Sequence, residues 1–261
     1  MSYAIAVRMV GADFLKLRKR RGTLIWALVL TLAPLLIYFI VRAAQHSSSP
    51  GAHSPAGGVG GYTDALRVLA MFFGPLAAIM IGTDAGAGDL AAGVFRDLVI
   101  TGRSRVALFA ARVPAALALC WLVVGLGYLL LIAGTYIFAA GTPDPSGALI
   151  ANGLAFSLLT TGVVCVVAVG FASLTGSRPA ALTVLIGWQL VVSPVLANIE
   201  SLGSSRKLVL SQAISHFSPI GVGGDRGSAV SMGAGMGIAV MLGWLVVFLA
   251  LGAWRTRTME A

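Results

Sequence analysis

Six long apolar runs alternate with short polar segments along the chain. They cover residues 24–41, 65–83, 113–140, 148–174, 179–199 and 229–254. A helix that crosses a bilayer needs roughly 20 consecutive, mostly apolar residues, and each run has about that length. The segments between them are rich in Gly, Ser, Pro and charged residues, which are typical of turns and loops. The pattern predicts an all-α polytopic membrane protein with six transmembrane helices.

A shorter amphipathic segment precedes the first run. Five apolar residues recur there at spacings of four and three, which places them on one stripe of a helix, while basic residues fall mostly opposite. The stripe consists of Tyr3, Val7, Val10, Phe14 and Leu17. Such a helix lies in the membrane interface, although a basic flank that only fixes topology is the simpler alternative. We expect one domain over 1–261, with an interfacial helix in 1–23, the six-span bundle in 24–254 and a tail in 255–261.

Basic residues are distributed unequally between the two sides of the predicted bundle. Of the 18 Lys and Arg residues, 13 lie on the side that holds both termini and the loops around 84–112 and 175–178. Cytoplasmic loops carry the excess of Lys and Arg in membrane proteins. We therefore expect both termini to be cytoplasmic.

Composition excludes an ordinary soluble enzyme and a disordered chain. Hydrophobic residues make up 58% of the 261 positions, charged residues only 10%, and the mean hydropathy is +0.93. Soluble domains carry about 25% charged residues. The net charge of +9 comes from basic residues that flank the apolar runs, so we expect no nucleic-acid partner. The 33 glycines suit helices that pack closely in lipid, and the Ala- and Gly-rich composition favours a bacterial plasma membrane.

The loop at 84–112 carries the most informative charges. It contains three of the nine acidic residues and a short apolar–basic segment at 94–100, which is long enough for about two helical turns. Gly93 precedes this segment and Gly102 follows it. A solvated loop is the simplest interpretation, because charges at a membrane surface cost little. A short helix with charged ends would instead form a docking surface for a cytoplasmic protein.

The spacing of residues in this loop carries a family resemblance. The pattern is Asp89-x3-Gly93-x2-Arg96-x-Leu98, followed by Gly102-x2-Arg105 and by Arg112. It resembles the loop between the second and third spans of the type 2 ATP-binding-cassette (ABC) exporter permeases. The chain departs from the family by having Asp89 in place of Glu, Val94 in place of Thr and Gly102 in place of Pro. The six-span layout and the basic amphipathic amino terminus are also similar to that family.

The resemblance implies a permease subunit that exports its substrate and catalyses no reaction itself. It implies a second permease subunit, identical or different, and two separate ABC ATPase subunits on the cytoplasmic side. By position, the helix that seats in the ATPase falls on Asp89, Gly93, Arg96, Leu98 and Arg105. The chain has no G-x-x-x-x-G-K-[ST] phosphate loop. ATP would therefore be bound by the partner, and we expect no cofactor, metal or catalytic residue in this chain.

Two further features concern a transport pathway. Gln189 is one of the few polar residues inside the predicted spans, and Pro194 in the fifth span would free a backbone carbonyl and bend the helix. The outside segment at 200–228 has an apolar middle at 208–217 that is too short to span the membrane. It predicts either a re-entrant helix or an ordinary surface helix. Spans with few charges suit a lipophilic drug, a peptide or a lipid-like substrate.

Two other functional classes remain as alternatives. Asp84, Asp89 and Asp97 could bind a divalent ion in an intramembrane lipid-modifying enzyme, although the Asp spacing fits only in part. An ion-coupled secondary carrier needs ionisable residues buried within the spans, and the predicted spans contain essentially none. Cys120 and Cys165 lie inside apolar runs, which favours a packing role over a disulfide or a metal site.

Overall fold

The structure is a computed structural model that describes residues 3–91, 93, 104–219 and 232–258. Within these ranges every regular element is a helix and there is no strand. The helices are α1 (Tyr3–Lys19), α2 (Arg21–Ser48), α3 (Gly58–Arg67), the π-helix η1 (Val68–Phe73), α4 (Gly74–Ala91), α6 (Arg105–Ile137), α7 (Gly147–Thr175), α8 (Arg178–Gly187), the π-helix η2 (Trp188–Val192), α9 (Ser193–Asn198), the 3₁₀-helix η3 (Glu200–Leu208), α10 (Leu210–Ser215) and α11 (Ala234–Thr258).

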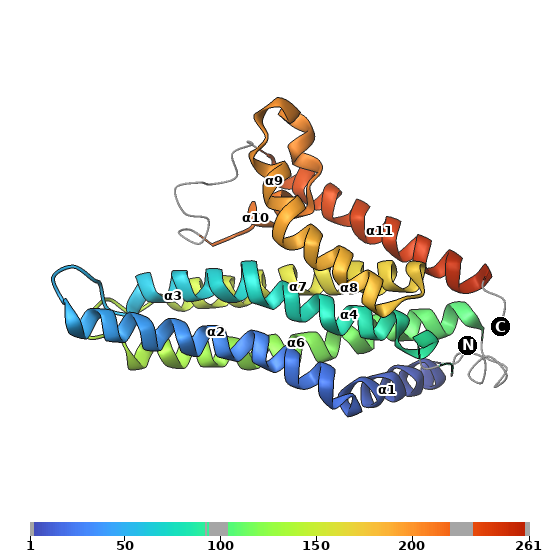
Figure 1. Cartoon of the computed structure of the whole chain (residues 1–261), viewed down its shortest axis with the longest axis horizontal. Coiled ribbons are helices and arrows are strands. Elements are labelled where there is room, and N and C mark those ends of the chain that lie inside the picture. Colours follow the sequence, from blue (N-terminus) through green and yellow to red (C-terminus); the bar gives the residue numbers. More distant parts are fainter. Residues whose placement is uncertain (1–2, 92, 94–103, 220–231, 259–261) are drawn as a thin grey trace.

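Six helical stretches of the described chain are long and apolar enough to cross a membrane, which confirms the predicted class. They are Arg21–Ser48, Gly58–Asp89, Arg105–Ile137, Gly147–Thr175, Arg178–Asn198 and Ala234–Thr258. The chain is thus a multi-pass membrane protein by helix length and hydropathy. Helix α1 and the carboxyl end of α11 lie at the same end of the molecule (Figure 1), as an even number of spans requires.

The spans form two layers. Helices α2, α3–α4, α6 and α7 run alongside one another, whereas α8–α9 and α11 form a second, inclined group (Figure 1). Helix α4 packs most extensively on α7. Gly82 and Gly86 permit this approach, because a Cβ at these positions would lie 2.6 Å from the Cys165 carbonyl oxygen and 2.5 Å from the Val169 carbonyl oxygen. The predicted role of glycine in close helix packing is therefore seen at this Gly-x-x-x-Gly pair.

The second span is longer than predicted. It begins at Gly58 and continues through η1 and α4 to Asp89, instead of covering 65–83. The prediction that a loop begins at residue 84 is therefore wrong, since Asp84 and Asp89 lie in the last turns of α4. A buried helix can include carboxylates when basic side chains from neighbouring helices pair with them. Those partners are distant in the sequence, so the residues around Asp84 and Asp89 do not reveal them.

Helix α1 occurs where the sequence predicts it. Leu17 is buried, and Val10 and Phe14 pack on the same core of α2, α4, α6 and α7. Val7, in contrast, is 51% exposed. Leu17, Phe14 and Val10 of the apolar stripe therefore contact the bundle, whereas Val7 is exposed on the outer surface. Cys120 and Cys165 are buried free thiols in this core, consistent with a packing role.

The segment that follows α9 folds back onto the bundle. Leu210, Ala213 and Ile214 of α10 are buried in the core that also contains Tyr62 and Phe156. Helix α10 therefore contributes side chains to the core, which favours the re-entrant alternative for the 208–217 segment over an ordinary surface helix. Residues 220–228 of this segment lie outside the described ranges.

Candidate functional site

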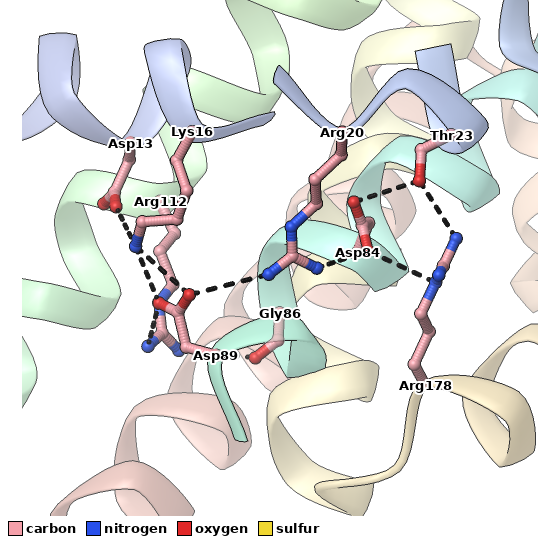
Figure 2. Close-up of polar contacts among 9 residues, drawn as sticks. All are labelled: Asp13, Lys16, Arg20, Thr23, Asp84, Gly86, Asp89, Arg112 and Arg178. Carbon is pink, nitrogen blue, oxygen red and sulfur yellow. Dashed lines mark hydrogen bonds and ion pairs between the residues drawn. The ribbon is translucent and has the colours of Figure 1, made fainter. Parts of the chain in front are cut away.

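A buried carboxylate lies at the end of the bundle that carries α1. The side chain of Asp84, on α4, has no exposed surface. Arg20 Nη1 donates to Asp84 Oδ1 at 2.7 Å, and the Thr23 hydroxyl donates to Asp84 Oδ2 at 3.1 Å. Arg178 Nε forms an ion pair with Oδ1 at 3.3 Å. Figure 2 shows that these partners converge on Asp84 from the α1–α2 junction and from the start of α8.

Asp89 forms a second centre about one and a half turns further along α4. Its carboxylate accepts hydrogen bonds from Lys16 Nζ, with the shorter distance 3.0 Å, and from Arg112 Nη2 at 3.1 Å. Arg20 Nη2 lies 3.8 Å from Asp89 Oδ1, so Arg20 joins the two carboxylates (Figure 2). Gly88 makes room for this guanidinium, because a Cβ there would overlap Arg20 Nη1.

Further contacts extend the cluster to the remaining helices of the first layer. Arg112 Nη1 and the Ser173 hydroxyl both donate to the Gly86 carbonyl oxygen, at 3.3 Å and 3.1 Å. Arg178 Nη2 donates to the Thr23 hydroxyl at 3.0 Å. We call the cluster the ion-pair network. Its members are Asp13, Lys16, Arg20, Thr23, Asp84, Asp89, Arg112 and Arg178.

The network pairs opposite charges from several helices, with one basic side chain in excess. Its three carboxylates face four basic side chains, drawn from α1, the α1–α2 junction, α6 and the start of α8. A buried charge that loses its partner is strongly destabilising, so these elements cannot separate independently at little cost. The arrangement therefore links α4, near its carboxyl end, mechanically to α1, α2, α6 and α8.

The residues predicted to contact an ATPase lie in different environments in the structure. Asp89 is buried in the network rather than presented on a loop. Gly93 is exposed in a turn after α4 with φ of +70°, a conformation that favours glycine. Arg105 is the first residue of α6, after Ser104 caps the helix by accepting from the Ala107 amide. Arg96 and Leu98 lie outside the described residues.

The network itself was not predicted from the sequence. The alternative in which Asp84, Asp89 and Asp97 bind a divalent ion has little support at the two described residues, because the oxygens of Asp84 and Asp89 contact Arg and Lys side chains. Among the described residues, no group of three His, Cys, Asp or Glu side chains could hold a metal, and Asp97 lies outside them. One sequence pattern could have predicted the network. Acidic residues follow the second apolar run, and basic residues flank three other apolar runs on the same side of the predicted bundle.

A cavity of about 300 Å³ lies between the two layers. Its walls come from α4 and η1, α7, α8 and η2, α10 and α11. Gln189 lines the cavity, and its place on a transport pathway stays a prediction. Pro194 lies just beyond η2, where the Ser193 amide bonds to the Trp188 carbonyl oxygen five residues back. The expected disturbance of the helix at Pro194 thus takes the form of a π-helical turn that places Gln189 beside the cavity.

Comparison with known proteins adds no family assignment. No protein-family model matches the chain, and no curated protein matches it. What is established is therefore the class that the helices define, a multi-pass α-helical membrane protein.

Proposed function

We propose that this chain is the membrane-spanning permease subunit of an ABC exporter in a bacterial plasma membrane. A separate ATPase subunit docks on the cytoplasmic segment between α4 and α6 and supplies the energy from ATP. A second permease subunit, identical or different, completes the pathway. The substrate class is a lipophilic drug, a peptide or a lipid-like molecule. Three observations support the proposal: the 89–112 pattern resembles a loop of the type 2 ABC exporter permeases, the chain has six candidate spans, and the ion-pair network lies near the carboxyl end of α4.

The observation that carries the proposal is the connection between the docking segment and the bundle. Asp89 stands near the carboxyl end of α4, and Arg112 lies two turns into α6, so the two residues flank the segment on both sides. They are joined at 3.1 Å. A push on the segment would therefore reach α4 and α6 together, and Arg20 and Arg178 would carry it to α2 and α8. A ligand-driven change of state needs such an element with two arrangements.

The two alternatives have less support. The intramembrane enzyme needs open carboxylates for its ion, whereas Asp84 and Asp89 are engaged by basic side chains. The secondary carrier needs a buried titratable group within a span, and Asp84 does lie in one. However, Asp84 is engaged by two arginines and a hydroxyl, which favours a structural role in joining the helices over the role of a proton carrier.

The decisive experiment is affinity purification of the tagged chain from its native membrane in mild detergent, with the purified sample assayed for ATP hydrolysis. We expect a nucleotide-binding subunit in stoichiometric amount. Arg96→Glu should abolish its recovery, because charge reversal on the docking segment opposes the partner. The matched control is Lys207→Glu, a charge reversal at the opposite end of the bundle, which should leave the recovery unchanged.

Other outcomes have definite meanings. Recovery of the chain alone, as a folded and monodisperse protein, would contradict the permease assignment and favour the two alternatives. An ATPase that copurifies equally with the wild type and with Arg96→Glu would retain the transporter class and contradict the assignment of the docking segment.

A further inference from the structure

The cavity between the two layers has a chemical character of its own. Five aromatic side chains line it, namely Phe156, Phe171, Trp188, Trp244 and Phe248. None of the described residues that line it is charged. Its polar groups are confined to Gln189 and a few hydroxyls. A small-molecule site has this composition, with apolar and aromatic walls and a small number of placed polar groups.

Four of these aromatic residues form a continuous series across η2, α11 and α7. The ring centroids of Trp188 and Trp244 are 5.6 Å apart, those of Trp244 and Phe248 are 5.5 Å apart, and those of Phe248 and Phe171 are 5.9 Å apart. Trp244 is fixed at its edge, because its indole N–H donates to the Leu208 carbonyl oxygen at 3.0 Å. These centroid distances are within the range at which aromatic rings attract one another, so a ring-bearing ligand can extend the series.

The polar groups occupy one part of the lining. The hydroxyls of Ser193 and Ser211 bond to each other at 2.6 Å, which joins the start of α9 to α10. Gln189 stands one turn before Ser193 and offers both a carbonyl and an amide. A neutral ligand with one or two hydrogen-bonding groups can pair with them. A charged ligand would enter without a counter-ion from the described lining residues, at high cost.

The helices that form the walls of the cavity meet closely next to it. Helices α7 and α11 meet at Gly170 and Gly252, where a Cβ on Gly252 would lie 2.8 Å from the Gly170 carbonyl oxygen. The cavity begins at Phe248, one turn away, where α8 and α10 form the remaining walls. Both π-helical segments, η1 and η2, contribute to its lining through Met71, Trp188 and Gln189. Turns of this kind are frequent at functional sites.

From these observations we propose that the cavity binds a neutral, ring-bearing lipophilic molecule with one or two hydrogen-bonding groups, inside a single subunit. As a substrate site it rests on the proposed function and narrows the substrate class. As a binding site it can be tested without an ATPase. The rings of the ligand stack along Trp188, Trp244 and Phe248, and its polar group faces Gln189 and the Ser193–Ser211 pair.

The test is a titration of the purified chain, in lipid nanodiscs, with N-phenyl-1-naphthylamine, a neutral two-ring probe with one N–H donor. Energy transfer from the five tryptophans to the probe reports its approach to the protein, and a saturable part of the signal that changes in the cavity variants reports binding beside Trp188 and Trp244. We expect a saturable signal above the linear rise that partition into lipid produces. Val184→Phe narrows the cavity from a half-exposed position that should tolerate the change, and it should raise the half-saturating concentration at least tenfold. Gln189→Leu should raise it about threefold.

The matched control is Val246→Phe on α11, whose side chain is 63% exposed and does not line the cavity. It should leave the titration unchanged. A linear signal in the wild type would overturn the proposal and assign the space to bilayer lipid. A saturable signal unaffected by both Val184→Phe and Gln189→Leu would overturn it as well. Neither result depends on recovery of an ATPase, so this proposal and the transporter assignment fail separately.

Discussion

The contact between α4 and α7 and the space between α7 and the α8–α11 layer differ in how they are filled. In the second and fourth spans, about 67% and 72% of the most apolar stretch is buried, whereas the fifth and sixth spans bury only 17% each. Gly82 and Gly86 bring α4 against α7 backbone to backbone, and the ion-pair network fixes one end of α4. On the other side of α7, side chains of α7, α8, α10 and α11 surround a cavity instead of filling it. One helix, α7, thus has a rigid side and a side with room for a ligand.

The largest expected loss of stability comes from disrupting the ion-pair network at the end of α4. Asp84→Asn keeps the shape of the side chain but removes the counter-charge of Arg178 and leaves Arg20 with Asp89 alone, at 3.8 Å. We expect a loss of about 3 kcal/mol in the free energy of unfolding, as for a buried ion pair that loses one partner. The measurement is the thermal midpoint of the detergent-solubilised protein, followed by size-exclusion chromatography.

The control for that change is Asp64→Asn at the other end of the same span. The Asp64 side chain is 43% exposed and its ion pairs with Arg67 and Arg42 are 3.5 Å and 4.0 Å long. Exposed pairs contribute about 0–1 kcal/mol, so the midpoint should barely move. Equal losses from the two substitutions would contradict the special role given to the network.

A second prediction concerns the contact between α4 and α7. Gly86→Ala adds a Cβ against the Val169 carbonyl oxygen and should cost about 2 kcal/mol, because backbone cannot yield as a flexible side chain does. Gly243→Ala on α11 adds the same atom to open space, with no neighbour within 4 Å. It should be neutral or stabilising by up to about 1 kcal/mol, as for glycine replacement in a helix. Identical thermal midpoints for the two variants would show that close packing of α4 on α7 is unimportant.

The same substitution on the two sides of α7 compares them directly. Val169 is fully buried against α4 and α6, whereas Val167 lines the cavity. Val169→Phe should cost about 1–3 kcal/mol by overpacking, and Val167→Phe less than about 1 kcal/mol, because the added ring has space. The difference between the two thermal midpoints measures how much room the cavity offers. A larger loss for Val167→Phe than for Val169→Phe would mean that the cavity is closed in the folded protein.

The smallest expected effect is at the outer wall of the cavity. Ser193→Ala removes the hydrogen bond to Ser211 and should cost about 1 kcal/mol, the typical contribution of one such bond. Because this bond joins α9 to α10, hydrogen exchange of the α10 amides should also rise in the variant. Unchanged exchange there would show that packing of Leu210 and Ile214 alone holds α10 in place.

The sequence predicted the six spans and the amino-terminal helix correctly but misplaced a boundary. Transfer of an apolar run into lipid depends on the local run itself, so hydropathy alone is sufficient for the spans. Asp84 was placed in a loop because an isolated carboxylate is costly inside a helix bundle. Its cost is met by Arg20 and Arg178, which lie 64 and 94 positions away in the chain, and nothing in the local pattern connects them.

The candidate site shows the same division. The sequence identified Asp89 and Gln189 as notable, the former for its place in a spaced pattern and the latter as a polar residue inside a span. It gave Asp89 an exposed role, whereas the structure buries it against Lys16 and Arg112. It could not group Gln189 with Trp188, Trp244 and Phe248, because the aromatic residues of several helices follow no shared period along the chain.

By itself, then, the sequence determined the class of the protein, the number of its spans and the excess of basic residues at one end, since each depends on the composition of single segments. Only the tertiary structure decided which carboxylates pair with which basic side chains and where the bundle leaves space. Those properties depend on contacts between residues as far apart as Thr23 and Arg178, 155 positions in the chain. Their energies arise only when the helices are packed, since a buried charge or an unfilled volume has no counterpart in an isolated helix.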